Sequence, residues 1–510
     1  MASTRDSLDR SRPALVVCAE GRGAYRSLAD AVRAAPPGHL IRVRPGTYSG
    51  PIVLDRNVEI RGDGPRALIT VDAIDVNCLV MQTDEASVRG LTLRGVHQGV
   101  EFFGVEIARG QLLLEDCDIS CESLACVATH GSATPILRNC VIHGGAQGGL
   151  FCWDRTSTEL ENCEIFGNAL AGIEVKQGAY VALYDCTLSG GRQGGLFAWE
   201  NGTGLMEKCD IYGNAYAGVV LRQVTDFTVR RCKIHDGKQG GILVLGEGTR
   251  GLFEECDIVG NALAGVEIRE GADPTIRNCK IHGGLQGGAY VWADADGLLE
   301  DCDIFDNTFA GVEAKDGANP VVRRCKIHDG KQGGVLIGPE GGGTFEDCEI
   351  ATNAYAGVEL KQDSAPVLRR CTLRDGKESG VYARDGSGGT LEECDIHGNG
   401  RAGVELKQGS HVTLRRCQIH NSAAAGVQVT EGGDGLLEDC DIGDNAGAGV
   451  EVTQESNPIV RGCRIHDNEG AGVHVHDGGR GTVEGCELSG NRGGAWQIED
   501  GVVDRRDNRE

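Results

Sequence analysis

Two histidines separated by one residue, His474 and His476, form the most specific metal-binding pattern in this 510-residue sequence. Side chains two residues apart on a β-strand point to the same face, so the two imidazoles would lie side by side. Glu451 precedes His474 by 23 residues, and Glu499 follows His476 by 23 residues. Imidazole and carboxylate groups together can bind zinc or a similar ion. The alternative is a pair of exposed histidines that form ion pairs with the neighbouring acids and bind no metal.

Cysteine is the second residue type that could bind metals or do redox chemistry, and its spacing is regular. Seventeen of the 22 cysteines follow one another at intervals of 23 residues, with a single interval of 24. This cysteine ladder consists of Cys117, Cys140, Cys163, Cys186, Cys209, Cys232, Cys256, Cys279, Cys302, Cys325, Cys348, Cys371, Cys394, Cys417, Cys440, Cys463 and Cys486. Cys121 and Cys126 lie outside it, and the sequence assigns them no role.

A strict repeat of this length, with Asn/Gly turns and alternating Val, Ile and Leu, is typical of stacked β-strands rather than of helical repeats. Each repeat then forms one coil, which is one turn of a parallel β-helix. We expect an all-β, single-stranded parallel solenoid of about 20 coils. The predicted regions are a disordered N-terminus (1–12), a cap with an amphipathic helix (13–35), irregular coils (36–116), regular coils with a 46-residue double repeat (117–493), and a C-terminal cap with a polar tail (494–510).

Stacking of the coils decides what the cysteine ladder can do. Successive cysteines would lie about 4.8 Å apart with parallel Cα–Cβ bonds, whereas a disulfide needs Cβ atoms that converge to about 3.8 Å. We therefore expect buried, reduced thiols that fill the core, in a reducing compartment. The alternative is coordination of a soft metal by thiolates, although no histidine accompanies the ladder.

Two stretches carry a resemblance to known proteins. DIHGNGRAGVELKQGSHVTLRRCQIH (395–420) resembles the CASH-type, right-handed parallel β-helix repeats of the pectate-lyase-like superfamily. YRSLADAVRAAPPGHLIRVRPGTYSGPIVL (25–54) resembles the N-terminal opening of pectin-esterase-like members. The resemblance implies the right-handed fold. It leaves activity open, because the superfamily includes polysaccharide lyases, hydrolases, esterases and epimerases as well as the non-enzymatic, substrate-binding β-helix of F-box proteins.

Charge and hydropathy argue against two classes of partner. The formal net charge is −25, which disfavours nucleic acid. The sequence has no run of 18 apolar residues and no apolar segment near its start, so we expect neither membrane insertion nor secretion but a cytoplasmic location.

Acid-type and base-type coils alternate along the ladder. Glu254 and Glu255 precede Cys256, for example, whereas Arg323 and Arg324 precede Cys325. Opposite charges on neighbouring strands stabilise a sheet by about 0.2–1 kcal/mol per pair, so we expect this alternation to fix the register of the coils. Two further recurring sets are expected to build turns: His143, His235, His282 and His328 by packing, and the GNA-like corners at Asn168, Asn214, Asn261, Asn353 and Asn399, where asparagine and glycine tolerate left-handed backbone.

One outward face of the coils varies in an informative way. Residues 10 and 12 positions after a ladder cysteine are small or aliphatic and should point inward, whereas residues 11 and 13 positions after it should point outward. The outward positions alternate between aromatic pairs and Glu/Lys or Glu/Arg pairs. The stripe that we predict as a ligand-binding surface comprises Phe151, Trp153, Glu174, Lys176, Phe197, Trp199, Arg222, Glu267, Arg269, Tyr290, Trp292, Glu313, Lys315 and Tyr382.

Two roles for the stripe stay open at this level. Its rings could simply pack over the cations of adjacent coils, or they could recognise a protein segment or sugar rings. The acids recur regularly beside cations, and no catalytic signature of the resembling families is recognisable. We therefore expect a non-catalytic scaffold without a cofactor that binds a protein or glycan partner. The alternative is a carbohydrate-active enzyme of the lyase, hydrolase or epimerase type. Nothing in the sequence predicts the oligomeric state.

Overall fold

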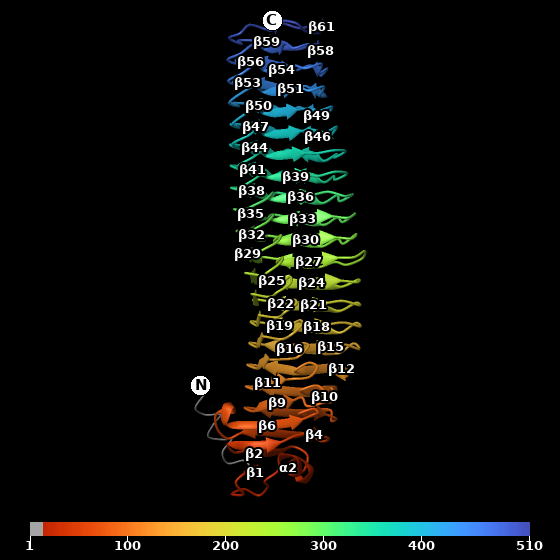
Figure 1. Cartoon of the computed structure of the whole chain (residues 1–510), viewed down its shortest axis with the longest axis vertical. Helices are drawn as coiled ribbons and strands as arrows, with labels where there is room; N and C mark the ends of the chain where they lie inside the picture. Colours follow the sequence, from red (N-terminus) through yellow and green to blue (C-terminus); the bar gives the residue numbers. More distant parts are fainter. Residues whose placement is uncertain (1–13) are drawn as a thin grey trace. The chain divides into compact units, whose positions relative to one another are not determined.

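The computed structural model describes residues 14–510, so the predicted disordered segment 1–12 lies outside the described residues. The chain is an all-β parallel solenoid of about 21 turns with a period of about 23 residues and almost no helix, as the sequence predicts (Figure 1). It comprises two compact units, residues 1–243 and 244–510, and the division falls within strand β27. Each coil contributes one strand to each of three parallel sheets, A, B and C.

In the first unit, sheet A contains β1 (Ala14–Val17), β2 (His39–Val43), β5 (Val58–Gly62), β8 (Glu85–Arg89), β10 (Val105–Glu115), β13 (Ile136–Arg138), β16 (Ser157–Glu161), β19 (Tyr180–Tyr184), β22 (Thr203–Glu207) and β25 (Asp226–Arg230). Sheet B contains β3 (Gly46–Ser49), β6 (Ile69–Ile74), β9 (Thr92–Val96), β11 (Asp118–Cys121), β14 (Val141–His143), β17 (Glu164–Phe166), β20 (Thr187–Ser189), β23 (Asp210–Tyr212) and β26 (Lys233–His235). Sheet C contains β4 (Ile52–Leu54), β7 (Leu79–Met81), part of β10, β12 (Val127–Ala133), β15 (Leu150–Cys152), β18 (Ile173–Val175), β21 (Leu196–Ala198), β24 (Val219–Arg222) and β27 (Ile242–Leu245).

In the second unit, sheet A contains β28 (Leu252–Glu254), β31 (Thr275–Arg277), β34 (Leu298–Glu300), β37 (Val321–Arg323), β40 (Thr344–Glu346), β43 (Val367–Arg369), β46 (Gly388–Glu392), β49 (His411–Arg415), β52 (Asp434–Glu438), β55 (Ile459–Arg461), β58 (Arg480–Glu484) and β61 (Val502–Arg506). Sheet B contains β29 (Asp257–Val259), β32 (Lys280–His282), β35 (Asp303–Phe305), β38 (Lys326–His328), β41 (Glu349–Ala351), β44 (Thr372–Arg374), β47 (Asp395–His397), β50 (Gln418–His420), β53 (Asp441–Gly443), β56 (Arg464–His466) and β59 (Glu487–Ser489). Sheet C contains β30 (Val266–Arg269), β33 (Ala289–Trp292), β36 (Val312–Ala314), β39 (Val335–Ile337), β42 (Val358–Leu360), β45 (Val381–Ala383), β48 (Val404–Leu406), β51 (Val427–Val429), β54 (Val450–Val452), β57 (Val473–Val475) and β60 (Trp496–Ile498).

A short helix lies at the start of the first unit, where the sequence predicts an amphipathic helix. Helix α2 (Leu28–Ala34) begins after Ser27, whose side chain accepts a hydrogen bond from the backbone of Asp30. Its apolar face, Leu28, Ala31 and Val32, is buried against β1, β2 and β4. A single 3-10 turn, η1 (Arg66–Leu68), follows later. None of the helices within residues 14–510 has the length and apolar character needed to span a membrane.

The final residues form strands within the region predicted as a cap and polar tail. Val473 pairs with Trp496 on β60, and Arg480 to Glu484 pair with residues 502–506 on β61. Arg505 lies 4.4 Å from the centre of the Trp496 ring. Residues 502–506 continue sheet A through backbone pairing with β58. Their charged side chains are compatible with this position because most of the strand is exposed to solvent.

The cysteine ladder is a column of buried free thiols, as the sequence predicts. All 22 cysteines are free and buried. Each thiol serves the backbone at one corner of its coil: Cys325 Sγ, for example, donates to the carbonyl oxygen of Leu299 on the preceding coil at 3.5 Å and to that of Arg323 at 3.3 Å. Burial raises the pKa of Cys78 to about 12 and that of Cys152 to about 11, which keeps these two thiols, both outside the ladder, protonated. The ladder cysteines thus pack in the core beside the backbone of their coils.

Polar side chains connect acid-type coils to the neighbouring base-type coils. Arg277 Nη2 lies 2.5 Å from Glu254 Oε1 on the preceding coil, and Arg323 Nε lies 2.9 Å from Glu346 Oε2 on the following coil. In sheet B, His235 Nε2 lies 2.9 Å from Asp210 Oδ1 and its ring stacks on Tyr212. A histidine–aspartate pair with the same spacing recurs at His143, His282, His328, His420 and His466. These histidines are turn-packing residues, as the sequence predicts.

The corners at these asparagines contain left-handed backbone, as predicted, but at the residue before each asparagine and not at the asparagine itself. That residue is a glycine at four of the five corners, such as Gly167 (φ 62°) and Gly213 (φ 62°), and is Thr352 (φ 53°) before Asn353. Asn168 and Asn214 are instead 1 % exposed, and their side-chain oxygens accept hydrogen bonds from the backbone of Gly145 and Gly191 on the preceding coil. Asparagine is required here because a buried backbone N–H needs an acceptor.

Candidate functional site

The outward face of sheet C carries the predicted stripe. Leu150 and Cys152 are buried, whereas Phe151 and Trp153 between and after them are half-buried and face outward. The same alternation holds for Phe197 and Trp199, for Tyr290 and Trp292, and for Tyr382. Arg222, Glu313 and Lys315 are also half-buried. The inward and outward assignments of these residues are confirmed.

Two of the three stripe tryptophans are fixed by their neighbours. Trp199 Nε1 donates to Glu174 Oε1 at 2.9 Å, and Lys176 Nζ lies 5.0 Å from the centre of its ring. Lys176 in turn lies 3.3 Å from the same Glu174 oxygen. Each ring is thus held by a carboxylate at its edge and a cation over its face.

The same arrangement recurs in the second unit. Trp292 Nε1 donates to Glu267 Oε1 at 3.1 Å, and the Arg269 guanidinium lies 5.5 Å from its ring centre. Tyr290 stacks against Trp292, and Lys315 lies 5.4 Å from the Tyr290 ring. Packing over adjacent cations, the simpler of the two roles considered for the stripe, therefore accounts for these rings.

Trp153 departs from this arrangement. The glutamates that accept the indole hydrogen bonds of Trp199 and Trp292 each lie 25 residues before the tryptophan. The residue 25 positions before Trp153 is Ala128, which cannot accept a hydrogen bond through its side chain. Among the described residues, the Trp153 indole nitrogen has no hydrogen-bond partner. One side of its ring stacks on His130 at 4.6 Å, and Phe103 lies 5.8 Å away.

An open hollow of about 330 Å³ borders Trp153. Its walls are mainly apolar, and polar groups from Gln147, Lys176 and Gln177 stand at its edge. The lining also includes Phe103, Leu124, Phe151 and Trp153. The hollow thus combines flat apolar surfaces, an indole donor and side-chain amides, which is the combination that small amphipathic groups require.

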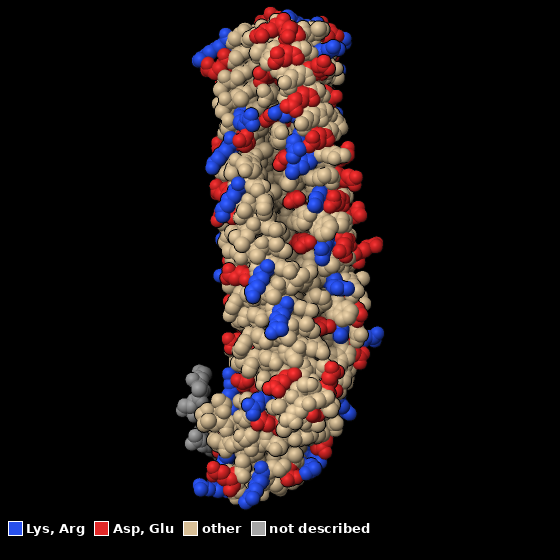
Figure 2. Space-filling model, in the orientation of Figure 1, with Lys and Arg blue, Asp and Glu red and all other residues tan. Residues whose placement is uncertain are grey.

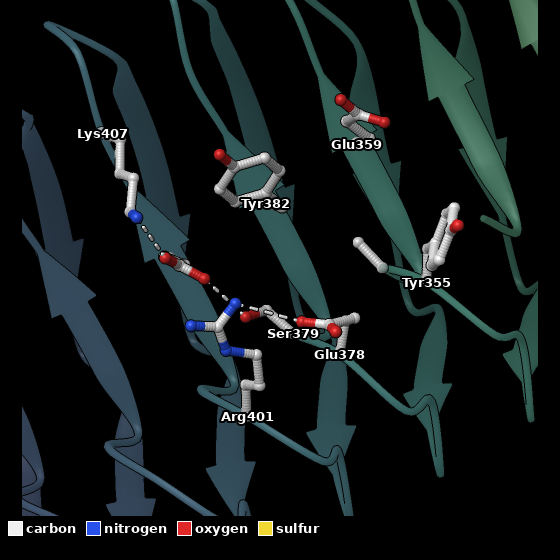
Figure 3. A pocket seen from close by; sticks show the side chains of 9 residues that line it. Tyr355, Glu359, Glu378, Ser379, Tyr382, Arg401 and Lys407 are labelled. Atoms are coloured by element: carbon white, nitrogen blue, oxygen red, sulfur yellow. Dashed lines mark hydrogen bonds and ion pairs between the residues drawn. The ribbon is translucent and has the colours of Figure 1, made fainter. Parts of the chain in front are cut away.

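A second hollow, of about 270 Å³, lies on sheet C of the second unit and is charged (Figure 3). Glu405 in this hollow is only 2 % exposed, and its carboxylate is held by Lys407 Nζ at 2.9 Å and by Ser379 Oγ at 2.8 Å. Arg401 pairs with Glu378 at 3.1 Å, and this contact together with Glu405 raises the pKa of Arg401. Tyr382 lies between the coil of Glu359 and that of Lys407.

Of the residues that line this charged hollow, the predicted stripe included Tyr382 and missed Tyr355, Ala356, Glu359, Glu378, Ser379, Arg401, Glu405 and Lys407. A signal was present, because three of these residues break the repeat. Glu378 and Ser379 stand at the positions that Gln332 and Gly333 occupy in the previous base-type coil. Arg401 stands where the other acid-type coils have an apolar or aromatic residue, such as Tyr355, which lies 46 residues earlier. Local exceptions to a repeat are the positions at which a function distinct from folding is expected.

The predicted metal cluster is brought together in the second unit. One ligand atom each from Glu451, His474 and His476 lies within 4.8 Å of the other two. Glu499 is not part of this group, although its Oε1 lies 3.5 Å from His474 Nε2. The contacts with Gln497 and His474 lower the pKa of the Glu499 carboxyl.

Charged side chains of both signs are interspersed on the face shown in Figure 2. Within the stripe, the acids stand beside cations: Glu267 beside Arg269 at 3.6 Å, and Glu359 beside Arg384 at 3.2 Å. Burial raises the pKa of Glu313, whose nearest cations counteract the effect. Regularly paired acids of this kind bind cations within the protein and are poorly placed to transfer protons.

Comparison with known proteins identifies the fold. A family model described as "Right handed beta helix region" matches residues 77–177, 137–251, 243–366 and 356–508. No curated protein matches the sequence. Solved structures with similar folds include a mutant of the periplasmic alginate epimerase AlgG, with 11% identity over 61% of this chain and 77% of that one and a TM-score of 0.40.

Two further structures are similar at the same low level. The A-module of the Azotobacter vinelandii mannuronan C-5 epimerase AlgE6 has 16% identity over 70% of this chain and 89% of that one, with a TM-score of 0.34. The pectate lyase Pel9A has 14% identity over 59% and 78%, with a TM-score of 0.32. Because the family model covers most of residues 77–508, the chain belongs to the right-handed β-helix family.

Proposed function

We propose that this protein is a non-catalytic β-helix scaffold that uses the outward face of sheet C to bind a protein or glycan partner. The observation that carries the proposal is the environment of Trp153. Trp199 and Trp292 use their indole N–H groups internally, whereas Trp153 keeps its N–H without an acceptor among residues 14–510 and borders a hollow. A solvent-accessible donor that the protein does not use internally, beside apolar walls, supports a role in recognition.

Of the two partner classes, the hollow at Trp153 favours a glycan. A sugar ring presents an apolar face of C–H groups, which matches the ring faces of Phe151 and Trp153, and hydroxyl groups at its rim, which match the side chains of Gln147 and Gln177. The volume of about 330 Å³ accommodates one or two sugar units. The rigid, internally braced rings of Trp199 and Trp292 would offer further contact area at little cost in side-chain entropy.

The pairing of the stripe acids argues against catalysis at those positions. A glycosidase needs one carboxyl group that holds a proton and a second that stays ionised, at a separation of about 5–9.5 Å. Glu174, Glu267 and Glu359 each lie next to a cation in the same sheet, so each is already engaged in an ion pair.

The charged hollow gives one reason to retain the enzymatic alternative. Arg401 and Lys407 could neutralise a uronate carboxylate, and the Tyr382 hydroxyl stands near them as a group able to exchange a proton. A carbohydrate-active enzyme of the lyase, hydrolase or epimerase type would place its reaction here and not along the regular stripe.

The free, buried thiols support a cytoplasmic location, because a reducing compartment preserves such a column. The interspersed charges and the net charge of −25 support a partner other than nucleic acid.

Binding and turnover are separated by one set of assays. The purified full-length chain is titrated with a panel of neutral and uronate oligosaccharides, and the same mixtures are analysed for new reducing ends, unsaturated products and altered uronate stereochemistry. We expect binding without turnover, weakened at least about tenfold by Trp153→Ala and less by Trp153→Phe, which keeps the apolar face but lacks the donor.

Trp199→Phe is the matched control, because it removes an indole N–H that is already used internally. Equal affinities of Trp153→Ala and the wild type for every ligand would refute the proposed site. Turnover that is lost in Arg401→Gln or Tyr382→Phe would replace the proposal by the enzymatic alternative.

A further inference from the structure

Near the end of the second unit, the stripe changes its chemistry in a way that the proposed binding role does not use. In the acid-type coils the stripe glutamate is followed two residues later by a cation: Lys176, Arg269, Lys315, Lys361 and Lys407 fill this position. After Glu451 the position holds Thr453. The next coil presents His474 and His476 at positions where four of the earlier base-type coils present aromatic residues. Glu451 therefore lies beside two imidazole groups and has no Lys or Arg two residues after it.

The structure brings these three residues together from two adjacent strands of sheet C. Glu451 on β54 pairs in register with His474 on β57, and His476 follows two residues later on the same face. His476 Nε2 lies 3.3 Å from Glu451 Oε1, and the two imidazole rings are 4.5 Å apart. Ligand–metal distances of about 2.0–2.2 Å place neighbouring ligands of a tetrahedral zinc ion about 3.4 Å apart, so little movement is needed.

Neighbouring groups orient the cluster as a metal site requires. His476 Nδ1 lies 3.0 Å from Asp477 Oδ2, which favours the tautomer with the proton on Nδ1 and leaves the Nε2 lone pair facing Glu451. Gln428 Nε2 donates to Glu451 Oε2 at 2.9 Å, so the other carboxylate oxygen remains directed at His476. A carboxylate that accepts from the far side of a ligating histidine and an amide that donates to a ligating carboxylate are the usual support of bound metals.

His474 provides an independent observation. Its Nε2 atom is buried and, among the described residues, makes no hydrogen bond. Glu499 Oε1 comes within 3.5 Å of it, but Glu499 has a side chain that is 60% exposed. A buried ring nitrogen without a hydrogen bond is unfavourable unless another partner binds it.

From this geometry we propose that Glu451, His474 and His476 bind one Zn²⁺ ion. Nitrogen and carboxylate ligands suit zinc, and three protein ligands leave a fourth position for water or for a donor atom of a bound partner. The ion would join two successive coils and supply the positive charge that Lys or Arg supplies beside the other stripe glutamates. The proposal is independent of whether the stripe binds a protein or a glycan.

The test uses untagged full-length protein, freed of metal by a chelator. Isothermal titration with Zn²⁺ should show one site at micromolar protein, and Co²⁺ at the same site should give the visible absorption of a tetrahedral complex. His476→Gln and Glu451→Gln should each weaken Zn²⁺ binding at least about tenfold, and His474→Ala with His476→Ala should abolish it. Glu499→Gln should retain it.

His466→Gln is the matched control. His466 lies in the same coil as the proposed ligands and also has two carboxylate partners, Asp441 and Asp467, each at 2.8 Å. Its replacement should leave Zn²⁺ binding unchanged. No binding by the wild type at micromolar Zn²⁺ would overturn the proposal, and so would binding that survives the double histidine variant, because that result would assign the metal to the cysteines or to surface acids. Circular dichroism of each variant checks that the coils remain folded.

Discussion

Glu405 is the most deeply buried acid of the stripe, and its replacement by glutamine should destabilise its part of the solenoid. The glutamate side chain is 3% exposed and lies 2.9 Å from Lys407 Nζ, whose side chain is 23% exposed. Glutamine preserves the shape and can still accept the Ser379 hydrogen bond, but it leaves Lys407 without its main counter-charge. The perturbation therefore removes one charge and very little packing.

The expected magnitude follows from these contacts. Breaking a fully buried ion pair by removing one partner costs about 3–5 kcal/mol. Lys407 retains some contact with water and lies 3.9 Å from Glu431, so we expect a smaller loss of about 2 kcal/mol. Glu359→Gln is the matched control: its side chain is 29% exposed and is shared by two cations, so a loss of about 0.2–1 kcal/mol is expected.

Hydrogen exchange is the appropriate assay, because a long solenoid unfolds locally and a single denaturation midpoint does not describe it. A loss of about 2 kcal/mol corresponds to roughly 30-fold faster exchange of amides on β45, β48 and β51. Amides on β30, far along the same unit, should be unaffected. Equal protection in Glu405→Gln and Glu359→Gln would refute the reasoning that burial makes the Glu405 pair strong.

Three further results are expected. All cysteines are buried, and burial raises the pKa of Cys152 to about 11. A thiol reagent at mildly alkaline pH should therefore leave the native protein unmodified and react with 22 thiols after denaturation. Fast labelling of the native protein would contradict the buried column of thiols. Burial lowers the pKa of His328, but hydrogen bonds to Asp329 and Asp303 outweigh it and raise the pKa, so its stabilising contribution is present below about pH 6.5 and is lost as the pH rises through the raised value. The hydrogen-exchange protection factors of amides on β35 and β38 should accordingly fall less with rising pH in His328→Gln, and an unchanged pH profile would argue against the ion pairs. Phe345→Ala, at a residue with 0% exposure, should cost about 3–5 kcal/mol locally and accelerate exchange on β37 and β43; a loss below about 1 kcal/mol would show that the coils close around the cavity.

The regular features of the fold were predictable because they depend on spacing alone. A 23-residue interval between cysteines and the alternation around Phe151, Cys152 and Trp153 determine which side chains share a face, and the structure places them accordingly. The helix within 28–34 was predictable from its apolar spacing for the same reason. Both inferences need only the residue types and their spacing, and neither needs the contacts of an individual side chain.

The charged hollow could not be predicted in the same way. Arg401 and Ser379 are visible as exceptions to the repeat, but their approach to Glu405 depends on how two adjacent coils pack in the turns before β45 and β48. His130 follows Cys117 by 13 residues, so the regular spacing places it beside Trp153, whereas Phe103 precedes the first ladder cysteine and cannot be aligned with the stripe by counting from a cysteine. The role of Asn168 required knowledge of a particular backbone N–H that is left without an acceptor.

The alternation of coil types constrains how this chain could lengthen or shorten during evolution. Histidine–aspartate pairs and tryptophan–glutamate contacts join an acid-type coil to the base-type coil that follows it, and arginine–acid pairs join coils of opposite type in either order. Insertion or loss of a single coil would place two coils of the same type side by side, with like charges in register and these contacts without partners at the junction. Insertion or loss of two coils would restore every contact, so we expect natural length variants of this protein to differ by multiples of 46 residues, about twice the ladder spacing.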